Sequence, residues 1–118
     1  MLRLKRRREF LRVQGDGLKW VAPGLILQAR RHGSGDETGN GDSGFRVGYT
    51  VSRKVGKAVQ RNRARRRLRA VANQVMPLHA RSGHDFVLIG RQATLKRTFR
   101  ALIGDLETAL RKLDAFDE

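Results

Sequence analysis

The chain has no cysteine, which excludes disulfide scaffolds, thiol nucleophiles and thiolate zinc sites. Long apolar runs are missing as well. The run from Phe86 to Ile89 is among the longest and falls far below the ~20 residues that span a bilayer, so no membrane partner is expected. Acidic residues are few, with 11 Asp and Glu against 26 Lys and Arg.

The resulting net charge of +15 indicates a polyanionic partner. A length of 118 residues predicts one domain, spanning residues 1–118. The basic start of the chain is followed by Glu9 and by no apolar segment of the kind that secretory signals carry, so we expect a cytoplasmic protein.

The charge is unevenly distributed. Between Asp42 and Asp85 there is no acidic residue and there are eleven basic ones, whereas residues 101–118 hold five acids and two bases. A solvated helix face normally mixes the two signs. The central segment therefore predicts a phosphate-binding surface, whose affinity should fall steeply with salt.

Hydrophobic periodicity predicts helices and strands in alternation. We expect a helix from Arg3 to Val13, a strand from Trp20 to Arg31 with Pro23 at an edge, and a strand from Phe45 to Ser52. Residues 33–44 are glycine-rich and predict a flexible connection, across which the two strands would pair antiparallel.

The second half predicts a helix from Val59 to Met76 stopped by Pro77, a buried strand from Phe86 to Gly90, and a helix over 98–113. Thr98 is the expected N-cap of that last helix, with Thr94 as the alternative, and Phe99 is placed on its core face. The order of elements predicts an α+β fold or a mixed α/β sandwich.

The helix after Val59 has two distinct faces. At about 100° per residue, an apolar stripe lies on one side, and Asn62, Arg66 and Arg69 fall almost opposite. The stripe consists of Ala64, Leu68, Val71, Ala72 and Val75. Guanidinium groups bind phosphate bidentately. Because i, i+4 repulsion among these arginines costs stability, their retention without any Glu indicates that the charge is used.

The same segment carries a family resemblance. Residues 55–69, VGKAVQRNRARRRLR, resemble the arginine-asparagine-arginine signature of the bacterial ribonuclease P protein subunit. Residues 46–54, RVGYTVSRK, resemble the strand before it in that family, while 9–13 and 85–89 fit its first helix and a later strand. The matches cover almost the whole chain in the expected order.

The resemblance implies a small mixed sheet packed with three helices in an α/β sandwich, with a left-handed strand–helix–strand crossover that departs from the usual right-handed rule. It implies a protein that binds the catalytic RNA of ribonuclease P and the 5′ leader of precursor tRNA. The endonucleolytic hydrolysis that removes the leader would be performed by the RNA subunit with Mg²⁺, with no catalytic residue, metal site or small-molecule substrate in this chain.

The family's RNA-contacting residues correspond to seven positions here: Arg46, Lys54, Arg61, Asn62, Arg63, Arg66 and Arg69. The leader would lie in a cleft between the first helix and the sheet, at Phe10, Gln14 and Gln28. Gln14 and Gln28 stand where many relatives carry aromatic residues. Since stacking commonly holds single strands, amide hydrogen bonds would replace part of it here.

Other interpretations of single residues are weaker. The three scattered histidines do not predict a metal site, and Val47 stands where a calcium loop would need its glutamate. Phe10 is compatible with either the core or a cleft, while Trp20, Phe45 and Phe86 are expected to pack. The residues themselves leave a ribosomal protein or a helix-turn-helix DNA binder as alternatives, although the basic helix is flanked by strands rather than by a short turn to another helix.

Overall fold

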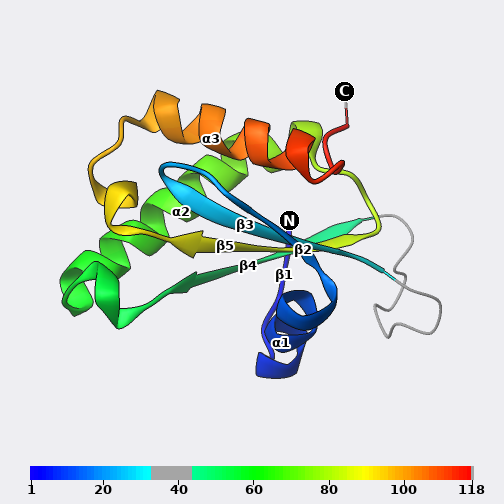
Figure 1. The fold of residues 1–118 in the computed structure, drawn as a ribbon, viewed down its shortest axis with the longest axis horizontal. Coiled ribbons are helices and arrows are strands. Elements are labelled where there is room, and N and C mark those ends of the chain that lie inside the picture. The colour runs from blue at the N-terminus through cyan, green and yellow to red at the C-terminus, as the bar shows by residue number, and fades with distance from the viewer. Residues whose placement is uncertain (33–43, 118) are drawn as a thin grey trace.

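The computed structural model describes residues 1–32 and 44–117, so most of the predicted 33–44 connection lies outside the described residues. Within that part, five strands form one mixed sheet in the order β1-β4-β5-β3-β2, and three helices pack on it (Figure 1). This confirms the predicted α+β class. The strands are β1 (Leu2–Arg3), β2 (Leu18–Val21), β3 (Leu25–Arg31), β4 (Phe45–Val51) and β5 (His84–Gly90). The helices are α1 (Arg7–Asp16), α2 (Ala58–His79) and α3 (Phe99–Lys112), with 3-10 turns η1 (Arg53–Val55) and η2 (Gln92–Leu95).

The sheet separates two hydrophobic clusters. Helices α2 and α3 cover one face, and α1 lies across the other (Figure 1). Strand β3 contributes to both faces because its side chains alternate. Leu25, Leu27 and Ala29 belong to the large core under α2 and α3, whereas the intervening residues face α1. The smaller cluster joins Leu4 and Val13 to Val87.

Strand β5 occupies the centre of the sheet, parallel to β4 and antiparallel to β3. The prediction that the strands around 20–31 and 45–52 pair with each other is therefore wrong, because β5 lies between them. The physical reason is burial on both faces: Phe86, Val87 and Leu88 are all at most 1% exposed, and such a strand belongs inside a sheet. Helix α2 makes the connection between the parallel neighbours β4 and β5.

The predicted strand from Trp20 to Arg31 is in fact a hairpin of β2 and β3. The turn closes at Pro23 and Gly24, where the Ala22 N–H donates to the Leu25 carbonyl at 2.9 Å. Gly24 packs closely here, since a Cβ atom would lie 2.5 Å from the side chain of Leu102 and 2.6 Å from that of Asp105, and both would have to shift.

Two predicted helix boundaries also change. The first helix begins at Arg7 rather than Arg3, because Leu2 and Arg3 pair with β4 as a parallel edge strand. Helix α2 continues through Pro77 to His79. In the last turn the missing proline N–H removes only one bond, and the Ala80 N–H still closes the helix onto the Met76 carbonyl at 2.9 Å.

Helix α3 begins where the sequence predicted. The Thr98 hydroxyl accepts a hydrogen bond from the Ala101 N–H at 3.1 Å, which confirms Thr98 as the N-cap. Phe99 was expected on the core face and is instead 40% exposed, as the first residue of α3, where the helix offers no preceding turn to cover it. Asp105 takes a buried position on this helix, next to Gly24.

Candidate nucleic-acid interface

Helix α2 is anchored by the face that the sequence predicted. Ala64, Leu68, Val71 and Ala72 are fully buried against the sheet and α3, and Val75 is 2% exposed. The opposite face therefore points away from the protein. It carries Asn62, Arg63 and Arg66, which are exposed, and Arg69, which is half-buried. We call these four residues the α2 ridge.

The ridge borders an open hollow of about 460 Å³, lined by Val59, Asn62, Arg65, Arg66 and Arg69. Arg65 Nη1 donates to Asn62 Oδ1 at 3.1 Å, so the amide is held in place by a neighbouring turn of the same helix. Val59 is 77% exposed at the edge of this hollow. A shallow site lined by guanidinium groups suits a phosphate backbone better than a small apolar ligand.

In the described part of the chain, no carboxylate neutralises the charge of the ridge. Among residues 1–32 and 44–117, the ion pairs of the structure involve no arginine of α2. Arg69 instead contacts an aromatic ring: its Cζ atom lies 5.7 Å from the centroid of Tyr49. Unpaired cations in a row along a helix attract a polyanion.

The start of α2 adds further positive charge. Gly56 adopts φ 153° and ψ −162°, a conformation open essentially to glycine alone, and turns the chain into the helix. The Lys57 N–H donates to Gln60 Oε1 at 2.7 Å, which caps the first turn. Lys54 is exposed in η1, and Arg61 is half-buried, with an Nε atom that finds no hydrogen-bond partner among the described residues.

Arg46 lies apart from the ridge. Its side chain projects from β4 to the α1 face, where it binds Asp85 through Nε at 2.9 Å and Nη2 at 2.7 Å, and Glu9 through Nη1 at 2.5 Å. The expectation that Arg46 lies near the basic helix face is corrected by this geometry. Both of its carboxylate partners belong to the chain itself, and Asp85 is only 2% exposed.

The pKa values around Arg46 follow from these contacts. Burial alone would raise the pKa of Asp85, but hydrogen bonds from Arg46 and His32 outweigh it and hold that pKa below its ordinary value. The pKa of Glu9 is lowered in the same way, against burial, by the backbone N–H groups of Arg6 and Lys5 and by Arg46. The bonds to Asp85 raise the pKa of Arg46, so all three groups stay charged at neutral pH.

The three residues expected at the leader cleft lie on the α1 face. The ring of Phe10 packs directly over Gly48, where a Cβ atom would approach it to 2.5 Å. Four residues later on the same flank of α1, Gln14 is exposed. Gln28 is half-buried in the cross-strand row formed by Gly48, Val87 and Gln28.

Beside α1, the described residues cover part of this face only partly. Thr50, Ile89 and Ile26 form the next cross-strand row, and all three are half-buried. We call this row the open strip. Phe10 and Gln14 lie on the flank of α1 opposite to Glu9, so they border the open strip while Glu9 faces Arg46. The structure thus brings the predicted leader residues to one face of the sheet and the ridge to the other.

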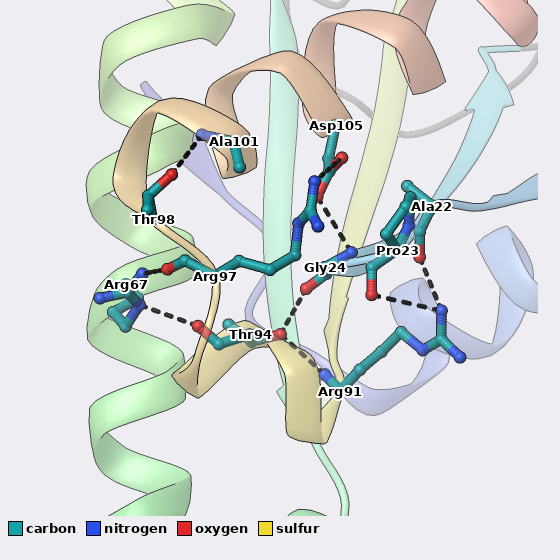
Figure 2. Close-up of polar contacts among 10 residues, drawn as sticks. All are labelled: Ala22, Pro23, Gly24, Arg67, Arg91, Thr94, Arg97, Thr98, Ala101 and Asp105. Carbon is teal, nitrogen blue, oxygen red and sulfur yellow. Dashed lines mark hydrogen bonds and ion pairs between the residues drawn. The ribbon is translucent and has the colours of Figure 1, made fainter.

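The sequence did not reveal the role of Arg67. Its Nε donates to the Thr94 carbonyl at 2.8 Å, and its Nη2 donates to the Arg97 carbonyl (Figure 2). Arg97 in turn binds Asp105 at 2.7 and 3.0 Å, and Asp105 accepts from the Gly24 N–H at 3.0 Å. Arg67 therefore ties α2 to the start of α3. In the sequence it shares the flank of the apolar stripe with Arg63, one turn away, so spacing alone does not distinguish it from a ridge arginine.

Within the described ranges, no group of three or more His, Asp or Glu side chains is arranged to hold a metal ion. His32 contacts Asp85 at 2.7 Å. None of the helices in the described part has the length and apolar character that crossing a membrane requires.

Comparisons with known proteins agree with this geometry. A family model described as Ribonuclease P matches residues 1–114. The ribonuclease P protein component of Paramagnetospirillum magneticum is 53% identical over 116 residues, covering 98% of this chain and 85% of the relative. That of Gluconacetobacter diazotrophicus is 49% identical over 110 residues, covering 93% and 89%.

Solved structures show the same fold. The RNase P protein from Thermotoga maritima superposes with a TM-score of 0.71 at 26% identity, covering 96% of both chains. The Staphylococcus aureus RNase P protein gives a TM-score of 0.77 over 99% of both chains, at 24% identity. The chain therefore belongs to the ribonuclease P protein family, whose members are the protein component of the tRNA-processing endoribonuclease ribonuclease P.

Proposed function

We propose that the α2 ridge, together with Lys54 and Arg61, binds the catalytic RNA of ribonuclease P in the cytoplasm. The observation that carries this proposal is the row of outward-facing cations without carboxylate partners in the described part of the chain. Arginine forks fit phosphate oxygens, and the amide of Asn62 adds a hydrogen-bonding group between them.

The second part of the proposal concerns the substrate. The 5′ leader of precursor tRNA runs along the open strip, where Phe10 offers a ring edge and Gln14 and Gln28 offer amides. A single strand needs an apolar platform and hydrogen-bonding groups beside it. Placing the two sites on opposite faces of the sheet lets one small protein contact ribozyme and substrate together.

The proposal also divides the chemical labour between the protein and the RNA subunit. Hydrolysis of the phosphodiester is assigned to the RNA subunit and its Mg²⁺ ions, while this chain binds, orients and screens charge. The two well-buried carboxylates, Asp85 and Asp105, are each engaged by an arginine, at 2.7 Å in both cases. Neither is placed to hold a metal ion on the ridge or along the open strip.

The direct test measures binding of the cognate catalytic RNA at physiological salt. Arg66→Ala and Arg69→Ala should weaken binding and reduce its salt dependence, because each removes a phosphate contact. Both variants should retain the fold, since neither side chain belongs to the buried stripe. Affinities equal to that of the unmodified protein would contradict the assignment.

A second measurement tests the division of labour. Adding the protein to the catalytic RNA at low Mg²⁺ should restore cleavage of precursor tRNA, and the protein alone with Mg²⁺ should cleave nothing. Cleavage in the absence of any RNA subunit would show that the chain has its own catalytic site.

A further inference from the structure

The ring of Tyr49 contacts guanidinium groups from two distant parts of the chain. Arg69 Cζ is 5.7 Å from the ring centroid, and Arg3 Cζ is 6.0 Å from it. Tyr49 belongs to β4 and packs against the large core, so its position is fixed by the sheet. Arg69 belongs to the α2 ridge, and Arg3 to the edge strand β1.

The topology explains how Arg3 reaches this place. Strand β1 pairs parallel with β4, with Arg3 opposite Val47. Because side chains alternate along a strand, Arg3 shares the α2 face with Val47 and Tyr49, whereas Leu4 turns into the small cluster on the α1 face. The edge strand thus carries one cation to the side of the sheet where the ridge lies.

Two guanidinium groups beside one ring repel each other, and the arrangement needs a compensating attraction. The face of the ring supplies part of it through cation–π contact. No carboxylate supplies the rest, since the ion pairs among residues 1–32 and 44–117 include neither Arg3 nor Arg69. The Nε of Arg69 is buried without a hydrogen-bond partner in the same part of the chain, so packing rather than hydrogen bonding orients this side chain.

We propose that Arg3 contacts the phosphate backbone of the catalytic RNA as an extension of the α2 ridge, and that Tyr49 is the positioning residue that holds Arg3 and Arg69 toward it. The proposal rests on the function proposed above for the ridge. It adds an element from the opposite end of the sequence, and it makes the RNA-binding surface continuous from α2 across β4 to β1.

The test measures the affinity of the cognate catalytic RNA over a salt series from 50 to 200 mM. Arg3→Gln should lower the slope of log affinity against log salt by about one, as the loss of one phosphate contact does. Arg66→Gln serves as the benchmark for the ridge. Arg100→Gln removes the same charge from an exposed position on α3 and should leave the slope close to that of the unmodified protein.

The positioning role of Tyr49 is tested with two replacements, one that keeps an aromatic ring and one that does not. Tyr49→Phe keeps the ring and should bind as the unmodified protein does, whereas Tyr49→Leu keeps apolar packing, loses the ring face and should weaken binding roughly threefold or more. In the Tyr49→Leu background, Arg3→Gln should have a smaller effect than alone, because the guanidinium is no longer held. Circular dichroism shows which variants remain folded. The RNA affinities of Tyr49→Phe and Tyr49→Leu are compared once both give the spectrum of the unmodified protein.

The outcomes separate the two proposals. If Arg66→Gln weakens binding while Arg3→Gln behaves like Arg100→Gln, the extension to β1 is overturned and the ridge stands. If Arg66→Gln also has no effect, the function proposed for the ridge fails, and the extension fails with it. Equal affinity of Tyr49→Leu and Tyr49→Phe would overturn the positioning role of the ring.

Discussion

Arg46 grips both carboxylate oxygens of Asp85, with Nε to Oδ1 at 2.9 Å and Nη2 to Oδ2 at 2.7 Å. The pair joins the neighbouring strands β4 and β5. The remaining Nη1 reaches Glu9 on α1, which also accepts the backbone N–H groups of Lys5 and Arg6 at 3.0 and 2.9 Å. Arg46, which the family resemblance assigned to RNA binding, therefore anchors α1 to the sheet.

We expect Arg46→Met to lower the free energy of unfolding by about 3 kcal/mol, because it leaves the buried Asp85 without its charged partner. Urea denaturation measures this. Arg53→Met, at an exposed position in η1, should change stability by less than about 0.5 kcal/mol. If Arg46→Met instead keeps full stability and loses affinity for the catalytic RNA, Arg46 acts at the interface and not in the fold.

Stability should fall in acid because of Asp85 and Glu9. Both have a pKa below the ordinary value in the folded protein, so the unfolded chain takes up protons first as the pH falls. Their contribution is fully present above the unfolded values near ~4 and is lost as the pH falls through the folded ones. The difference in urea midpoint between the unmodified protein and Asp85→Asn should therefore become smaller below about pH 4. The exposed Asp117→Asn should show no comparable gap, and a gap for Asp85→Asn that is constant with pH would contradict the assignment.

Neighbouring arginines on α2 should respond differently to substitution. Arg67→Ala leaves the carbonyls of Thr94 and Arg97 without their donor and should cost about 1–3 kcal/mol of stability, with little effect on RNA affinity of the folded fraction. Arg66→Ala should do the reverse, because its side chain is exposed. Thermal melting and RNA titration on both variants separate the roles, and identical behaviour would refute the distinction.

Leu68→Ala should be strongly destabilising. The side chain is fully buried between α2 and the sheet, so its truncation removes apolar burial and leaves a cavity, at a cost of about 2–5 kcal/mol. The exposed Val59→Ala on the same helix should be close to neutral. Thermal melting followed by circular dichroism compares the two, and an unchanged midpoint for Leu68→Ala would count against the packing described.

Gly48→Ala should displace Phe10. The new Cβ would lie 2.5 and 2.6 Å from atoms of the Phe10 ring, which must move because the strand backbone is fixed on both sides. Base stacking on an aromatic contributes about 1–3 kcal/mol, so the affinity for a leader-carrying precursor tRNA should fall roughly fivefold or more.

The holoenzyme's affinity for mature tRNA provides the internal control, since it lacks the leader and should not change with Gly48→Ala. Gly104→Ala, where nothing lies within 4 Å of the new Cβ, is the matched variant and should leave both affinities unchanged. Equal losses with leader and without it would place Phe10 outside leader recognition.

The local sequence pattern was sufficient to predict the helices that have a regular spacing of apolar residues or a clear N-cap. The buried stripe of α2 and the Thr98 cap of α3 follow from side-chain spacing and from a hydroxyl at the right position, and both are local properties. The outward direction of Asn62 and Arg66 follows in the same way, since burying one face of a helix exposes the other. The charge asymmetry and the family signature needed no structure at all.

Tertiary structure decided what depends on partners distant in the chain. The central place of β5 comes from burial on both faces, and the pairing of Arg46 with Asp85 comes from strand register. Arg46 and Arg66 are the same residue type in one basic segment, yet one is neutralised inside the fold and the other is open to solvent. Residue type sets what an arginine can bind, but only the packing of strands and helices determines whether a carboxylate of the same chain reaches it first.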